Sequence, residues 1–215
     1  MTIPSYIDGR RVTEIGSSAF KKRGTLRSVT IPKTVETVGR EAFADCTSLR
    51  TLTIQNGVSC LGYLAFSGCT SLTSVTIPGS VTRLGTSSGY SDGYASTFAG
   101  CTSLRSVTLQ NGVSLIGNNM FSGCRSLTTV SVASSVKSIG EYAFRSCSSL
   151  RTITIPTSVE SIGSCAFYGC NSLSSVKLQT GLTSIGRGAF QACKSLSSVT
   201  IPKTVETVGR EAFAD

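Results

Sequence analysis

Cysteine is the residue type with the greatest chemical potential in this chain of 215 residues, and its spacing limits what that chemistry can be. Seven of the nine cysteines recur in one column: Cys46, Cys69, Cys101, Cys124, Cys147, Cys170 and Cys193. Cys60 and Cys165 lie outside this column. The chain has no C-x-x-C pair and no histidine, so the ligand spacing of a zinc site is absent. We therefore predict no metal and no cofactor.

The cysteine column could instead supply disulfides or buried thiols. Neighbouring repeats would place equivalent Cα atoms about 5 Å apart, which a disulfide can span, but parallel side chains suit its torsion angle poorly. We expect free thiols that pack as small hydrophobic residues, with Cys60 and Cys165 as the more exposed pair. A disulfide staple or a reactive thiol remains the alternative.

Catalysis is disfavoured by the residue inventory. Without histidine, neither a Ser-His-Asp nor a Cys-His arrangement can be built. Acidic residues number 11 and recur at repeat positions, as Glu36, Glu160 and Glu206 do, which is typical of solvated faces. The sequence predicts that the protein is not an enzyme.

Five cations recur among columns of serine and threonine at outward positions of the predicted strands. They are Arg27, Arg50, Arg105, Arg151 and Lys177. Arginine on a preorganised polar surface suits the recognition of carboxylate or sulfate groups, although charges that only keep the protein soluble explain the pattern equally well. Ice binding through flat T-x-T arrays is a further interpretation, which these cations disfavour.

The cysteines and cations belong to a repeated unit, which the phenylalanines mark. All nine phenylalanines occupy the same position of this unit. They are Phe20, Phe43, Phe66, Phe98, Phe121, Phe144, Phe167, Phe190 and Phe213. Successive phenylalanines are 23 residues apart, except for the 32 residues between Phe66 and Phe98. The unit has the form L-x-x-V-x-I-P-x-x-V-x-x-I-G-x-x-A-F-x-x-C, and such periods are typical of solenoids.

Each unit predicts one coil. The alternation in residues 150–155 predicts a short strand with one buried face, which Pro156 ends. Val159 and Ile162 form a second extended segment, and Gly163 marks either a positive φ or close packing. The following Ala-Phe segment predicts a short helical turn that places its ring inside the coil. Stacked coils about 4.8 Å apart would bury these positions against one another.

The sequence thus predicts an α/β-type repeat solenoid, with one short parallel strand per coil. We expect a single domain over residues 1–215, with an extended first repeat at 1–25, a loop insertion at about 85–97 and an incomplete last repeat at 196–215. Insertions in repeat proteins become surface loops and often mark a binding face. Within this one, Tyr90, Asp92 and Tyr94 are candidate binding residues, because tyrosine offers contact area at low entropic cost.

Residues 198–215 repeat residues 28–45 without a change. This identity indicates a recent duplication or recombination within a longer array. The chain also ends within a unit and shows no polar cap, which solenoids normally need. We expect either a fragment of a longer protein or an end that stacks on another copy.

The strand signature L-x-x-L-x-L of leucine-rich repeats is matched by Leu49-x-x-Leu52-x-Ile54, and a cysteine precedes it by three residues in Cys46-Thr47-Ser48-Leu49. Together with the I-P and I-G-x-x-A-F elements, this pattern resembles the BspA-like (Treponema-type) class of leucine-rich repeats. The resemblance implies a surface-exposed or secreted protein of a host-associated bacterium or protist, with a role in adhesion. It carries over no catalytic residues.

We therefore expect a non-enzymatic, extracellular or cell-surface module that binds a host matrix or cell-surface protein. A structural or self-assembling spacer is the alternative. A net charge of +9 also suggests nucleic acid or another polyanion, but the cations form no long run, so nucleic acid is not favoured. No run approaches the 18 or so apolar residues of a membrane span, and no secretory signal precedes the first repeat.

Overall fold

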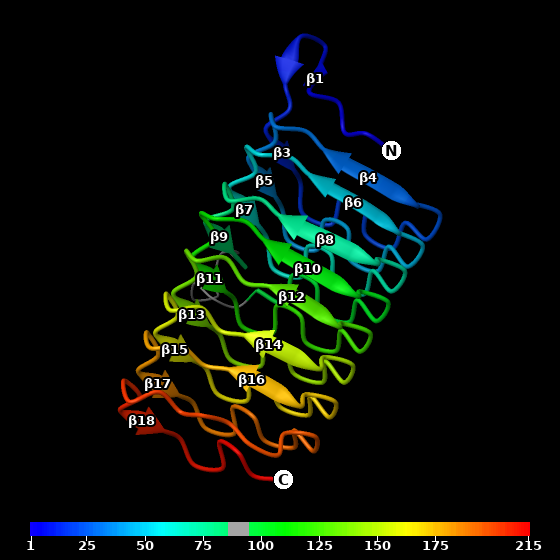
Figure 1. Cartoon of the computed structure of the whole chain (residues 1–215). Coiled ribbons are helices and arrows are strands. Elements are labelled where there is room, and N and C mark those ends of the chain that lie inside the picture. The colour runs from blue at the N-terminus through cyan, green and yellow to red at the C-terminus, as the bar shows by residue number, and fades with distance from the viewer. Residues whose placement is uncertain (86–94) are drawn as a thin grey trace.

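The chain winds into a stack of coils, and seven of these coils have a long strand on one side and a short strand on another (Figure 1). This computed structural model describes residues 1–85 and 95–215. The long strands are β4 (Ser28–Ile31), β6 (Thr51–Ile54), β8 (Ser74–Ile77), β10 (Ser106–Leu109), β12 (Thr129–Ser131), β14 (Thr152–Thr154) and β16 (Ser175–Lys177). The short strands are β3 (Glu14–Ile15), β5 (Thr37–Val38), β7 (Cys60–Leu61), β9 (Arg83–Leu84), β11 (Leu115–Ile116), β13 (Ser138–Ile139), β15 (Ser161–Ile162), β17 (Ser184–Ile185) and β18 (Thr207–Val208).

Paired strands of successive coils run parallel and keep equivalent residues opposite one another. Val107 of β10, for example, pairs with Val75 of β8 and Val130 of β12. Three separate ladders connect the long strands: β4–β6, β8–β10–β12 and β14–β16. The short strands form two ladders, β3–β5–β7–β9 and β11–β13–β15–β17–β18.

Alternation along each long strand sends one set of side chains inward and the other outward. In β6, Thr51 and Thr53 are exposed, whereas Leu52 and Ile54 are buried. A register shift of one residue would place the apolar set in water, so the hydrophobic pattern specifies the register. The predicted short strand is present in seven coils and has one buried face in six of them, whereas Val130 of β12 is partly buried.

The phenylalanine rings form one continuous column inside the stack. Adjacent ring centroids are 5.0 to 5.8 Å apart, and the ring planes deviate from parallel by 1° to 16°. Seven of the nine side chains are fully buried, and Phe20 and Phe213 at the two ends are partly buried. The same hydrophobic cluster extends from Ile3 to Ala212, so the coils share one core. The prediction that phenylalanine fills the interior of the coil is confirmed.

The predicted short helical turn around each phenylalanine is wrong, because the described residues contain no helix. Glu41 and Asp45, on either side of Phe43, have φ angles of 54° and 58°, which lie outside the right-handed helical region. The Phe43 amide donates to Ala65 O of the next coil at 2.8 Å, whereas the Ala44 amide donates to Glu41 O at 3.0 Å. Amides thus alternate between the next coil and the local turn, and we call this arrangement the turn ladder.

The glycine before each turn permits close packing of successive coils. A Cβ atom on Gly163 would lie 2.7 Å from Glu141 N and 2.7 Å from Gly140 C. Gly163 does not adopt a positive φ. Of the two roles predicted for this glycine, close packing is therefore the one the structure shows.

The N-terminal end of the stack is covered by the extended first repeat. Strands β1 (Tyr6–Ile7) and β2 (Arg10–Arg11) form an antiparallel hairpin whose turn residues, Asp8 and Gly9, have φ angles of 50° and 74°. Positive φ at both turn positions matches the twist of a two-residue hairpin. The Ile3 amide donates to Thr30 O at 3.0 Å, so the first residues add a rung beside β4.

The last coil departs from the prediction, because residues 198–200 form no strand. The identical sequence at residues 28–31 forms β4, where β6 pairs along one edge and the N-terminal residues along the other. Ile201 is 42% exposed, whereas its equivalent Ile31 is fully buried. Pairing and burial at this sequence therefore depend on the neighbouring coils. In the described part of the chain, no helix is long and apolar enough to span a membrane.

Candidate functional site

The outward residues of the seven long strands and the residue immediately before each strand form one surface, which we call the strand face. Arg27, Arg50, Arg105 and Arg151 directly precede β4, β6, β10 and β14, and Lys177 ends β16. All five cations are exposed. The structure thus brings these five predicted binding residues onto one side of the stack, on which the long strands lie in succession (Figure 1).

The charges of the chain are unequally divided between this side and the rest of each coil. The segment from the cysteine position to the end of the long strand recurs eight times, at residues 23–31, 46–54, 69–77, 101–109, 124–132, 147–155, 170–178 and 193–201. These segments contain eight of the 20 cations and none of the 11 acidic residues. They therefore carry a charge of +8, nearly all of the net +9 of the chain.

The cations of the strand face are not neutralised by the protein itself. Ion pairs of the described residues lie elsewhere, for example between Arg11 and Glu36 at 3.2 Å and between Lys137 and Glu160 at 3.6 Å. Within residues 1–85 and 95–215, the side chains of the five predicted cations make no ion pair and no hydrogen bond to another residue. Their donors therefore point to solvent and can bind an external anion.

A hollow of about 340 Å³ separates two of these arginines. Arg50 and Arg105 flank it, and Thr73 lies on the coil between them. Ser71, Ser103 and Ser126 complete the lining. These serines were not among the predicted binding residues, although the recurring C-x-S-L element marks their column. The hollow combines two guanidinium groups with hydroxyl donors.

A groove of about 310 Å³ lies on the same face where β6 and β8 are not joined by a ladder. Its lining residues are Leu52, Thr53, Ile54, Ser74, Val75 and Thr76. Thr73 of the hollow and Ser74 of the groove are consecutive in the chain, so the two depressions are neighbours on one surface.

The predicted binding loop cannot be placed in the same way. Tyr90, Asp92 and Tyr94 lie outside the described residues. The described flanks are Gly85, directly after β9, and Ala95, before the turn that contains Phe98. These flanks lie at the end of a short strand and at the start of the turn ladder.

Comparison with known proteins assigns the repeat. The family model described as a BspA type leucine-rich repeat region, with six copies, matches residues 11–91 and 94–215. The chain belongs to this family. No curated protein sequence matches it.

Solved structures of bacterial leucine-rich repeat proteins resemble this BspA-type chain. A leucine-rich repeat protein of T. pallidum is 26% identical, with a TM-score of 0.65 over 98% of this chain and 84% of that protein. One from Bacteroides ovatus is 25% identical, with a TM-score of 0.53 over 95% and 87% of the two chains. A leucine-rich cell surface protein of Faecalibacterium prausnitzii is 24% identical, with a TM-score of 0.54 over 99% and 78%, and its likeness shows the fold alone.

The cysteine column of this BspA-type repeat is structural. The seven column cysteines are free thiols and are at most 3% exposed. The Cys124 thiol donates to Phe98 O of the preceding coil at 3.3 Å, and burial raises its pKa well above the ordinary value. The prediction of free, buried thiols is confirmed. The expectation that Cys60 is exposed is wrong, since it is 2% exposed, whereas Cys165 is partly exposed.

A second surface feature, which the sequence analysis missed, joins tyrosines and arginines of the turn ladder. The Arg145 guanidinium lies 5.7 Å from the centroid of the Tyr142 ring and 5.8 Å from that of Tyr168. Arg40 lies 5.5 Å from the Tyr63 ring centroid. These are cation–π distances, so the aromatic rings already hold the guanidinium groups. The signal in the sequence was the placement of these residues one to three positions from phenylalanine.

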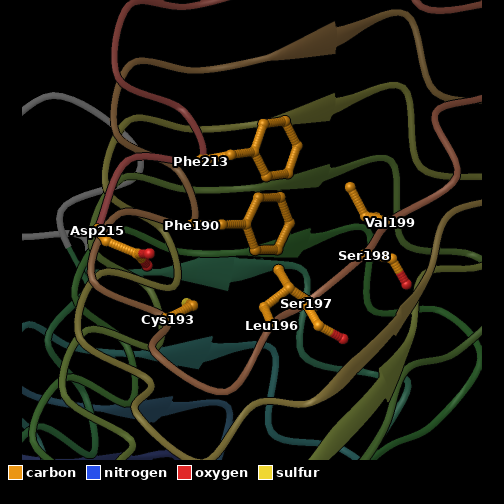
Figure 2. Close-up of a pocket in the computed structure, with 8 residues that line it drawn as sticks. All are labelled: Phe190, Cys193, Leu196, Ser197, Ser198, Val199, Phe213 and Asp215. Carbon is orange, nitrogen blue, oxygen red and sulfur yellow. The ribbon is translucent and has the colours of Figure 1, made fainter.

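The last coil of the BspA-type stack is open on one side. A hollow of about 270 Å³ is bounded by Phe190, Cys193, Leu196, Val199, Phe213 and neighbouring residues. Figure 2 shows the two phenylalanine rings stacked, with Val199 at the side of the hollow. Val208 is 49% exposed here, whereas its equivalent Val38 is fully buried. The open side therefore displays residues that another coil covers in the interior.

Proposed function

We propose that this chain is a non-enzymatic binding module of a cell-surface or secreted protein, which adheres to a matrix or cell-surface protein of a host. Leucine-rich repeat regions of this family are generally protein-interaction modules. The strand face supplies the contact surface, and residues 1–215 act as one binding unit.

The charge division between the two parts of each coil is the observation that carries this proposal. A protein that needs charge only for solubility has no need to exclude acids from one side of every coil. Acidic residues are absent from all eight segments, and the arginine side chains of the strand face have no internal partners among the described residues. An unneutralised, preorganised polar surface favours recognition of a negatively charged partner.

The comparisons support the proposed location without assigning it. The F. prausnitzii structure is that of a leucine-rich cell surface protein, and it has the same fold. A stack of this kind presents its long strands to a partner without a change in shape, which suits an adhesive role.

Bulky substitutions on the strand face test the proposal. Thr76→Tyr with Thr108→Tyr adds two large side chains on paired, exposed positions of β8 and β10 without changing the charge. Ser138→Tyr with Ser161→Tyr makes the same addition to two paired short-strand positions and serves as the matched control. We expect the first pair to reduce adhesion to host matrix or cells by roughly tenfold and the second to leave it unchanged. Equal adhesion by both variants would contradict binding through the strand face.

The insertion at about 85–97 is a second proposed contact region, with Tyr90, Asp92 and Tyr94 as its binding residues. Replacing Tyr90 and Tyr94 together by alanine should weaken adhesion, because tyrosine supplies contact area at low entropic cost. Adhesion that persists unchanged removes the loop from the binding site and leaves the strand face as the contact surface.

A second candidate function is end-to-end self-association into an array. It is favoured by the exposed apolar side chains of the last coil, Ile201 at 42% and Val208 at 49%. Light scattering during size-exclusion chromatography distinguishes the two functions. A species that stays monomeric at high concentration argues against the array, whereas growth that Val208→Asp abolishes supports it.

A further inference from the structure

We infer that the strand face binds a linear acidic polysaccharide, with Arg50, Arg105 and Arg151 each contacting a sulfate or carboxylate group along the stack axis. This inference rests on the proposed function, because it names the class of ligand that the strand face takes. It goes beyond adhesion to a protein by assigning the contact to the glycan coat of a cell or matrix.

The spacing of the arginines suits a polymer with regularly repeated charges. In six successive coils the residue before the long strand is Arg50, Thr73, Arg105, Thr128, Arg151 and Ser174, so arginine alternates with a small hydroxyl residue. Coils about 4.8 Å apart place these arginines about 10 Å from one another. Every second coil therefore offers a guanidinium group, with room between for the uncharged part of the polymer.

The hollow between Arg50 and Arg105 is built to donate hydrogen bonds. On other coils, outward hydroxyls are already used as donors: Thr128 Oγ1 donates to Arg105 O at 3.1 Å and Ser174 Oγ to Arg151 O at 3.2 Å. Among the described residues, the hydroxyls that line the hollow, of Ser71, Thr73, Ser103 and Ser126, donate to no protein acceptor. Two cations and four available hydroxyl donors thus converge on a space of about 340 Å³. Such a donor set matches a sulfate or carboxylate group.

The uncharged residues of the strand face favour a polysaccharide over the other polyanions. Its outward strand residues and the residue before each strand are all serine, threonine, arginine or lysine. Without aromatic rings on this face, single-stranded nucleic acid has no platform on which to stack its bases. The outward strand positions carry no aromatic or aliphatic side chain, so they offer a matrix or cell-surface protein no hydrophobic hot spot, and the acidic sugar chains of that partner are the part that they can bind. Hydroxyl groups, in contrast, can exchange hydrogen bonds with the hydroxyls of a sugar chain.

Titration with heparin, a sulfated polysaccharide, tests this inference with variants of equal charge. Arg50→Gln, Arg105→Gln and Arg151→Gln together remove three of the five cations of the strand face. Arg83→Gln, Lys137→Gln and Arg187→Gln remove three exposed cations from the short-strand and turn sides and form the matched control. We expect the dissociation constant to rise at least roughly tenfold in the first variant and to change less than about twofold in the control.

Salt dependence gives a second readout of the same contacts. If each arginine displaces a counterion, the slope of log affinity against log salt should become less negative by roughly two in the first variant, and by much less in the control. Equal slopes in the two variants would show that heparin responds only to net charge and would overturn the inference.

Three further probes separate failure of this inference from failure of the proposed function. Chemically desulfated heparin should bind at least roughly tenfold more weakly than heparin. A DNA duplex or a polyglutamate could instead bind as tightly as heparin and lose the same affinity in the variant that lacks Arg50, Arg105 and Arg151. In that case the ligand of the strand face is that polyanion, and the polysaccharide is overturned. Adhesion that depends on Thr76 and Thr108, combined with no binding of heparin, would overturn the inference and leave the proposed function standing. If adhesion does not depend on Thr76 and Thr108 and heparin does not bind, both the inference and the proposed function are overturned.

Discussion

Single positions of the repeat have the same structural role in every coil, and the environment changes only at the ends of the stack. Phe121 lies between two other rings, with centroid distances of 5.8 and 5.5 Å, and is fully buried. Phe213 contacts a ring on one side only and is partly buried. The contribution of a residue to the free energy of unfolding therefore depends on the coils beside it as well as on its type.

Phe121→Ala should lower the free energy of unfolding by about 3–5 kcal/mol, because it leaves a cavity in a closely packed column. Phe213→Ala should cost less than about half as much, since its side chain is only partly covered. Urea denaturation measures both values. Equal losses in the two variants would contradict the difference in packing.

The buried cysteine column makes stability depend on pH in the alkaline range. Burial raises the pKa of Cys124 well above that of an exposed thiol, which is about 8.5. Above that pH, the unfolded chain loses a proton that the folded chain keeps, so the free energy of unfolding falls as pH rises.

Cys124→Ser keeps a small hydrogen-bond donor but removes this titration. Between about pH 9 and 10, the fall in unfolding free energy should be smaller by about 1 kcal/mol per pH unit than in the unsubstituted chain. Urea denaturation at several pH values gives both slopes. Parallel slopes would show that the thiol ionises as readily in the folded state as in the unfolded one.

At the scale of the element, the turn ladder shows why the strands could be predicted and the turns could not. Alternation in Leu150-x-x-Ile153-x-Ile155 has period two and predicts a strand directly. The Ala-Phe turn has apolar residues at a spacing that a helical turn would also give. Its actual conformation depends on amides such as that of Phe43 reaching the next coil, at 2.8 Å from Ala65 O. A contact between coils is not encoded in the local pattern of one coil.

Close contact at the glycine column can be tested by comparing two positions of that column. Gly163→Ala would bring a Cβ atom within 2.7 Å of backbone in the preceding coil, so it should destabilise the fold by roughly 1–3 kcal/mol. Gly16 occupies the same position in the first coil, and a Cβ atom there would meet nothing within 4 Å. Gly16→Ala should be neutral or slightly stabilising in the same thermal or urea denaturation. A destabilisation shared by both variants would point to backbone conformation and away from packing.

At the scale of the whole molecule, stacking creates the binding surface. No described coil contributes more than one cation to the strand face, but the stack aligns Arg50, Arg105 and Arg151 from every second coil on that face. The sequence identified these residues because the period of the repeat aligns them. It did not identify the hollow at Thr73 or the break between β6 and β8, since both depend on the spacing of separate coils.

The open side of the last coil predicts a gain in stability when another coil covers it. Residues 198–215 are identical to residues 28–45, which residues 46–68 follow in the chain, so appending a copy of residues 46–68 after Asp215 recreates an interior junction. Covering Ile201, Val208 and Phe213 should contribute roughly 1 kcal/mol each to the free energy of unfolding. The same appended residues in scrambled order provide the control. If both extensions raise the midpoint of urea denaturation equally, specific stacking is not the cause.

An NMR titration with a heparin oligosaccharide tests the central claim, that stacked coils create an anion-binding strand face, most directly. The side-chain Nε–H signals report each arginine separately. The account predicts that the signals of Arg50, Arg105 and Arg151 shift and saturate together, while those of Arg83 and Arg187 change little. Shifts concentrated at Arg10 and Arg11 of the N-terminal hairpin, or spread equally over all arginines, would contradict it.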